Sequence, residues 1–104
     1  MLLPKAVYKK AELNHYHIYN QYVIRVQKRD ELRKYLTENE IGSEIYYPVP
    51  FHMQECFSYL GYKKGDFPVS EWCAADSIAL PIYPELSKEQ IEFTVKTISE
   101  FTGK

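Results

Sequence analysis

Two prolines separated by one residue interrupt the middle of the chain. They lie in residues 47–50, Tyr-Pro-Val-Pro. Proline has no backbone N–H to donate to a sheet, and it biases the residue before it towards extended backbone. We therefore expect a short strand at residues 43–47 that ends here, followed by a stiff segment whose backbone is exposed.

One strand and one helix are expected before these prolines. Residues 17–26 are rich in β-branched and aromatic side chains and lack glycine and proline, as is typical of a strand. Alternation predicts a core face made of Ile18, Tyr22, Ile24 and Val26. The opposite, more polar face carries His17, Tyr19, Gln21, Val23 and Arg25. A helix is then expected from residues 28–31, with its apolar stripe at Leu32, Tyr35 and Leu36 and a stop at Gly42.

Two helices are expected soon after the prolines. Apolar residues at 53, 56, 57 and 60 have helical spacing, and Gly61 is expected to end that short helix. After a loop at residues 62–66, Pro68 favours the start of a second helix. Its expected apolar stripe is Val69, Trp72 and Cys73.

The end of the chain predicts an extended segment and a final helix. Residues 78–83 are apolar with Pro81 among them, which indicates a short edge strand or an extended segment. Residues 87–90, Ser-Lys-Glu-Gln, form a capping-box pattern. Ile91, Val95 and Ile98 follow at helical spacing and are expected to form the stripe of the last helix.

These elements predict an α+β fold: a small, three-stranded, mainly antiparallel sheet packed with about four helices. The 104 residues suit one domain, with residues 1–15 as a lead-in segment. The formal net charge of −1 argues against a nucleic-acid binder. No apolar run is long enough to span a membrane, and the start does not resemble a secretory signal. We therefore expect a soluble, cytoplasmic chain.

Cysteines and two histidines offer little chemistry. Cys56 and Cys73 lie inside helical patterns without a Cys-x-x-Cys spacing, so we interpret them as reduced core residues. His15 and His17 would point the same way on a strand, but Glu12 is the only acid near them before the helix. We therefore expect polar histidines at a strand entry and no metal site.

His52 is the more informative histidine. It follows Tyr46, Tyr47 and the two prolines, so a rigid turn would hold two phenols and an imidazole together. Such a turn suits ligand contact, but it also suits a helix N-terminus with an aromatic staple, and both readings stay open. The sequence has no glycine-rich phosphate loop and no nucleophile elbow, so we expect no self-contained active site and no catalytic residue.

Several motifs, in one order, closely resemble the carboxy-terminal part of the DegT/DnrJ/EryC1/StrS aminotransferases, which use pyridoxal phosphate (PLP) to convert nucleotide-linked keto sugars to amino sugars. The motifs are residues 19–25 (YNQYVIR), 29–32 (RDEL), 45–52 (IYYPVPFH), 67–71 (FPVSE) and 80–86 (LPIYPEL). The resemblance runs from about Leu3 to the final helix. It implies the small carboxy-terminal domain of the aspartate-aminotransferase (type I) fold.

The resemblance also implies what this chain lacks. In the family a lysine forms the Schiff base with PLP, an aspartate pairs with its pyridine nitrogen and a cup grips its phosphate. Those elements lie in a large domain that has no counterpart here, and none of the ten lysines matches the cofactor-lysine motif. We therefore expect PLP in full-length family members but none on this chain alone, which would be inactive by itself.

By the same resemblance, Tyr46, Tyr47 and His52 are the expected contacts to the nucleotide sugar, and Arg25 is a weaker candidate for anion or interface contact. The expected partners are a large aminotransferase domain or further copies of the chain. The chain would then be a portion of a sugar aminotransferase of surface-polysaccharide biosynthesis, or one half of a split enzyme. The alternative is a freestanding non-catalytic module that binds a partner subunit or a nucleotide sugar.

Overall fold

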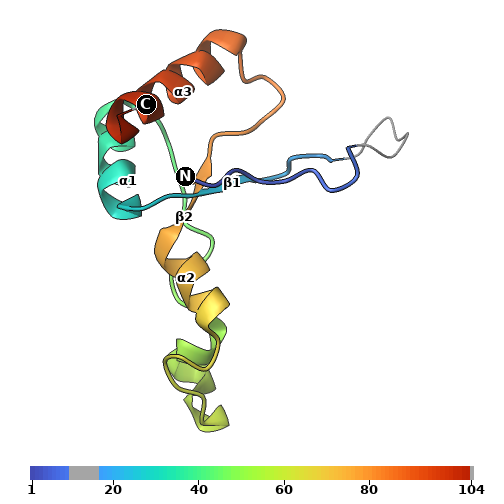
Figure 1. The fold of residues 1–104 in the computed structure, drawn as a ribbon, viewed down its shortest axis with the longest axis vertical. Coiled ribbons are helices and arrows are strands. Elements are labelled where there is room, and N and C mark those ends of the chain that lie inside the picture. Colours follow the sequence, from blue (N-terminus) through green and yellow to red (C-terminus); the bar gives the residue numbers. More distant parts are fainter. Residues whose placement is uncertain (10–16, 104) are drawn as a thin grey trace.

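A short antiparallel sheet at the centre of the molecule pairs a strand from the first quarter of the chain with one from its last third (Figure 1). The computed structural model describes residues 1–9 and 17–103. The elements in chain order are β1 (Tyr22–Arg25), α1 (Arg29–Glu38), the 3-10 helices η1 (Phe51–Met53) and η2 (Glu55–Leu60), α2 (Pro68–Asp76), β2 (Ser77–Leu80) and α3 (Lys88–Thr102). The predicted α+β class is confirmed.

The sheet has two strands in the described residues, where three were predicted. β1 pairs with β2 so that Ile24 faces Ile78, and single bridges add Leu2 beside Arg25 and Glu44 beside Ala79. Glu44 and Ala79 exchange two backbone hydrogen bonds of 3.1 and 2.7 Å. Residues 43–47 pair no further, because the chain then turns into the proline segment, whose prolines have no N–H to donate.

The core lies where α1 and α3 pack beside the sheet. Its buried side chains are Ile24, Val26, Leu32, Leu36, Ile41, Ile78 and Ile98, with Tyr22, Leu80 and Phe101 packed against them. The rings of Tyr35 and Phe101 join the two helices at a centroid distance of 5.6 Å. Burying one large aliphatic side chain contributes about 1.5–3 kcal/mol, so this cluster is the main source of stability.

Three of the predicted helix boundaries are confirmed and one is wrong. The capping box at Ser87 and Gln90 is confirmed, as are Pro68 at the start of α2 and Gly61 at the end of η2. The predicted stop at Gly42 is wrong, because α1 ends at Glu38. Asn39 caps it, with its side-chain amide donating to the Tyr35 carbonyl at 2.8 Å.

The predicted apolar stripes include side chains that lie on the surface. The strand predicted over residues 17–26 spans only Tyr22–Arg25, and Ile18, expected on its core face, is 83% exposed. Trp72, expected in a helical stripe, is 60% exposed. The stripe of α3 splits, since Ile98 is buried while Ile91 and Val95 are exposed. Helical spacing shows which residues share a face, but the small core covers only part of each face.

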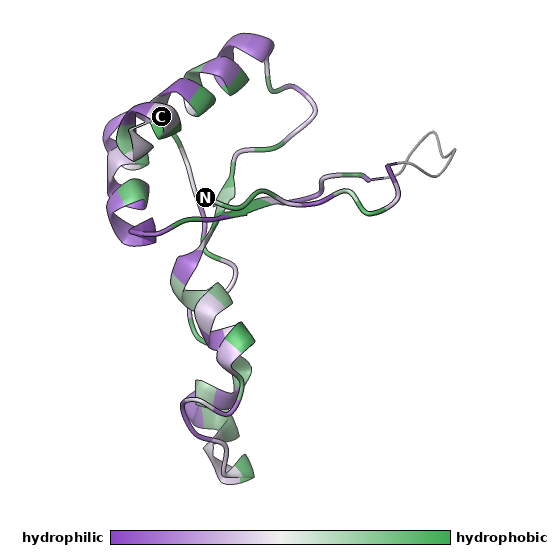
Figure 2. Cartoon of the chain, in the orientation of Figure 1, coloured by the Kyte–Doolittle hydropathy of each residue, from purple (hydrophilic) through white to green (hydrophobic). Residues whose placement is uncertain are grey.

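Residues 46–76 form an arm that runs away from the sheet (Figure 1). Its only residue classed as buried is Ala74, and Figure 2 shows apolar residues recurring along the arm to its far end. The chain measures 48 × 40 × 24 Å with a radius of gyration of 16.3 Å. A compact domain of about 100 residues has a radius of about 13 Å. The arm therefore lacks a core of its own.

Two arginines attach this arm to the core. Arg29 is 9% exposed, and its Nη1 donates to the carbonyls of Ala74 and Ser77 at 2.9 and 3.0 Å. Arg25 donates from Nε and Nη2 to the two carboxylate oxygens of Asp76, both at 2.9 Å. The carboxy-terminal end of α2 is thus fixed at the base of the arm, where β2 begins.

Candidate functional site

The two tyrosines of the proline turn lie at the base of the arm. Tyr46 is 42% exposed and Tyr47 is 69% exposed, and their rings meet edge to face at 5.9 Å. They line an open cavity of about 550 Å³ together with Val49, Pro50, Phe51, Gln54, Ser70, Cys73 and Ala74. The cavity is therefore bounded by the turn on one side and by α2 on the other.

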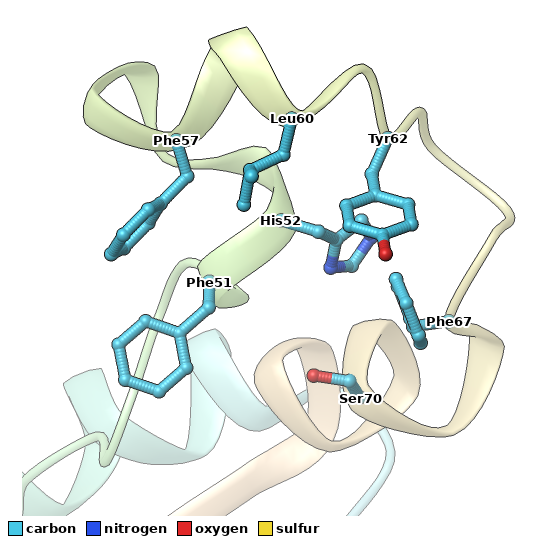
Figure 3. A pocket seen from close by; sticks show the side chains of 7 residues that line it. All are labelled: Phe51, His52, Phe57, Leu60, Tyr62, Phe67 and Ser70. Carbon is cyan, nitrogen blue, oxygen red and sulfur yellow. The ribbon is translucent and has the colours of Figure 1, made fainter.

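His52 lines a second cavity of about 330 Å³ further along the arm (Figure 3). Its other lining residues are Phe51, Phe57, Leu60, Tyr62, Phe67 and Ser70. Phe51 and Ser70 belong to both cavities, so the two are neighbours on the same side of α2. The structure thus brings Tyr46, Tyr47 and His52 to one stretch of the arm.

The imidazole of His52 is built into the arm and not displayed on it. Its side chain is 5% exposed and packs edge to face on Phe67 at 5.0 Å. Nε2 is buried and lies 3.4 Å from Oε2 of Glu71, longer than a well-formed hydrogen bond. His52 lies within η1, so it stands inside a short helix with aromatic side chains around it. Burial among aromatic side chains in η1 favours a structural role for His52, and its place in the wall of a cavity favours ligand contact.

Arg25 stands apart from this stretch of the arm. It lies on β1 and lines neither cavity, and two of its guanidinium nitrogens donate to Asp76. These hydrogen bonds raise the pKa of Arg25 above its ordinary value. The ion pair accounts for the position of the guanidinium without any ligand.

The remaining predicted residues show no ligand geometry. Cys56 and Cys73 are free, but Cys56 is exposed, so the expectation that both are core residues is wrong for it. Nδ1 of His17 accepts the backbone N–H of Tyr19 at 2.9 Å. His15 and Glu12 lie outside the described residues.

No group of metal-binding side chains is found within residues 1–9 and 17–103. Over the same residues, no helix is long and apolar enough to cross a membrane.

Sequence reasoning missed Glu71, the carboxylate beside His52. Its two oxygens accept the backbone N–H of Gly65 at 3.0 and 2.8 Å. Periodicity places Glu71 on α2 as an ordinary first-turn acid, where the helix dipole favours a negative charge. The sequence signal that could have found it is its position. Glu71 lies in the first turn of the helix that follows the loop after His52, and that loop contains Gly65.

The two cavities on the arm do not fit PLP by themselves. PLP chemistry requires a lysine amine and a carboxylate at the pyridine nitrogen. Neither cavity has a lysine or a carboxylate among its lining residues. The lysines of the described chain are exposed. These cavities can offer phenols, an imidazole and apolar walls to a ligand held by other groups.

The chain matches known proteins over most of its length. It is 46% identical over 86 residues to the "pleiotropic regulatory protein" of Geobacillus stearothermophilus, covering 83% of this chain and 23% of that protein. It is 33% identical over 85 residues to the dTDP-3-amino-3,6-dideoxy-α-D-galactopyranose transaminase of Aneurinibacillus thermoaerophilus, covering 82% and 23%. The chain thus spans about a quarter of the length of these curated relatives.

Solved structures also resemble the chain over most of its length. A TM-score of 0.77 at 28% identity relates the chain to DesV of S. venezuelae, which was solved with a ketimine intermediate. A TM-score of 0.73 at 35% identity relates it to a DegT DnrJ EryC1 StrS aminotransferase from Brucella abortus. The fits cover 81% of this chain and 23% and 22% of those chains. Residues 3–99 match the model of the DegT/DnrJ/EryC1/StrS aminotransferase family, and the chain belongs to that family.

Proposed function

We propose that this chain is the carboxy-terminal portion of a PLP-dependent aminotransferase that acts on a nucleotide-linked keto sugar. It shapes the substrate cleft and does not catalyse the reaction alone. The amino donor expected from the family is glutamate. Membership of the family supports the reaction class. The alternative, a freestanding module that binds a partner or a nucleotide sugar, is distinguished below.

The exposed apolar surface of the arm carries this proposal. Phe51, Tyr59 and Trp72 are 72, 79 and 60% exposed on an arm without a core. Monomeric soluble proteins rarely leave large contiguous apolar patches in water, so such a surface indicates contact with more protein. About three-quarters of the length of the curated relatives lies outside the matched region and is the first candidate cover, and the large PLP-binding domain lies within it by resemblance. Further copies of the chain are the second possible cover.

Within this proposal the arm supplies substrate contacts. Tyr47 is the most exposed of the three arm candidates, and its phenol can exchange hydrogen bonds with a sugar hydroxyl or a phosphate oxygen. Tyr46 borders the same cavity, and His52 borders its neighbour. Arg25 is the weaker candidate, since Nη1 is its one guanidinium nitrogen outside the bonds to Asp76.

Calorimetry and turnover on the purified chain test the proposal against the alternative. The chain would be titrated with a dTDP-sugar and a UDP-sugar, then incubated with PLP, glutamate and a keto sugar. We expect no amino transfer, because the arm cavities have no lysine for the cofactor. We also expect no micromolar binding, because in this proposal the arm supplies only one side of the substrate cleft. Micromolar binding without turnover would favour the freestanding module, and turnover would refute the claim that the chain is inactive alone.

A further inference from the structure

Glu71 lies where three segments of the arm meet. Its backbone is in the first turn of α2, its carboxylate accepts the N–H of Gly65 in the preceding loop, and Oε2 reaches His52 of η1. The side chain is 15% exposed, much less than the acids in the first turns of most surface helices. A mostly buried carboxylate that links two other segments is unlike a solvated surface acid.

The loop that presents Gly65 is itself ordered by local bonds. The N–H of Asp66 donates to the carbonyl of Lys63 at 3.1 Å, and the Asp66 carboxylate accepts the N–H of Lys63 at 2.7 Å. The backbone of Gly65 has φ +96°, a conformation that residues other than glycine rarely adopt. The N–H of Gly65 is therefore held in place, and it fixes both oxygens of Glu71 from the loop side.

The buried nitrogen of His52 lies beside Glu71. Nε2 is shielded from water, and within the described residues it makes no hydrogen bond of good geometry. Oε2 of the Glu71 carboxylate lies 3.4 Å from this nitrogen. Phe67 packs against the ring, and Figure 3 shows the imidazole lying among Leu60, Tyr62 and Phe67. Aromatic and aliphatic side chains crowd the ring, and the Glu71 carboxylate is the charged group beside Nε2.

We propose that Glu71 is a positioning residue that holds the His52 imidazole with Nε2–H directed at its carboxylate, so that Nδ1 is the nitrogen offered to the sugar substrate. A carboxylate can only accept, so the neutral imidazole must carry its proton on Nε2 to bond with it. Nδ1 is then a lone-pair acceptor for a substrate hydroxyl. The role of Nδ1 rests on the proposed function, whereas the Glu71–His52 link does not.

The test is the tautomer of His52, measured by NMR on the full chain labelled with ¹⁵N-histidine. The spectrum of His52→Gln assigns the signal, and the pH is kept where the imidazole is neutral. Because a hydrogen bond to a charged acceptor has a net value near that of a tenfold change, we expect Nε2–H to exceed Nδ1–H by about tenfold. Glu71→Ala should reduce that ratio at least threefold, and Glu71→Gln should reduce it less, because one oxygen remains.

Glu89→Gln is the matched control, since Glu89 is also a first-turn acid but belongs to α3. Its ratio should equal that of the unsubstituted chain. Circular dichroism checks that each variant keeps its helices. If Glu71→Ala unfolds the arm, the isosteric Glu71→Gln decides the matter. An Nδ1–H majority in the unsubstituted chain, or one ratio shared by all folded Glu71 variants, would overturn the inference.

The same variants separate this inference from the proposed function. Suppose that Glu71→Ala changes the tautomer, but His52→Gln leaves kcat/KM unchanged in an enzyme completed with the remaining family domain. Then Glu71 positions His52, and the assignment of His52 to the substrate is wrong. Suppose instead that His52→Gln lowers kcat/KM, but the tautomer ratio of His52 is the same in the Glu71 variants as in the unsubstituted chain. Then the substrate contact stands and the positioning role fails.

Discussion

Replacing Arg29 by methionine should loosen the attachment of the arm to the core. Arg29 is 9% exposed and donates to two carbonyls, those of Ala74 at 2.9 Å and Ser77 at 3.0 Å. Methionine keeps much of the volume but donates nothing, so two buried carbonyls would lose their partner. Hydrogen bonds from a charged donor contribute about 1.5–3 kcal/mol each, so we expect a loss of about 3 kcal/mol or more.

Urea unfolding of the full chain, followed by circular dichroism, measures this loss. The control is Asp30→Asn, which weakens the 2.7 Å bond from Arg29 Nε to a carboxylate whose side chain is 79% exposed. An exposed pair of this kind contributes about 0–1 kcal/mol, so the control should lose little. A loss below about 1 kcal/mol for Arg29→Met, with an unchanged m-value, would refute the view that Arg29 anchors the arm.

Further substitutions test the core, a helix cap and the arm surface. Leu36→Ala should cost about 2–5 kcal/mol in urea unfolding because Leu36 is fully buried, and a loss below 1 kcal/mol would contradict that packing. Ser87→Ala removes the oxygen that accepts the Gln90 N–H at 3.1 Å and should cost about 1 kcal/mol, seen as a lower Tm, whereas an unchanged Tm would contradict the capping box. The chain should self-associate at tens of micromolar in light scattering, since its arm exposes aromatic surface. Trp72→Ser should shift it towards the monomer, and a clean monomer before substitution would count against the prediction.

The sequence predicted best those features that depend on a few neighbouring residues. The capping box of Ser87 and Gln90 is a local hydrogen-bond exchange, and Gly61 ends η2 because its φ is +77°. The strand at β2 stops before Pro81, as a residue without an N–H requires. Such features need no knowledge of what packs against them.

Features that depend on partners could not be predicted in the same way. Trp72 and Val95 have the spacing of a core stripe, yet both are exposed, because periodicity says only that residues share a face. An apolar face that packs on another protein has the same residue spacing in the sequence as a face that packs in the core. The Glu71–His52 contact was missed for a related reason, since it joins residues that only the folded arm brings together.

The central claim is that these residues serve as the substrate-side portion of a sugar aminotransferase. The most direct measurement replaces the matching segment of the 33% identical Aneurinibacillus transaminase with residues 3–99 of this chain and records amino transfer to that enzyme's dTDP-sugar. We predict that the hybrid transfers the amino group, and that Tyr47→Ala combined with His52→Gln lowers kcat/KM at least tenfold. A hybrid that folds and retains PLP but transfers nothing, or one indifferent to both substitutions, would contradict the account.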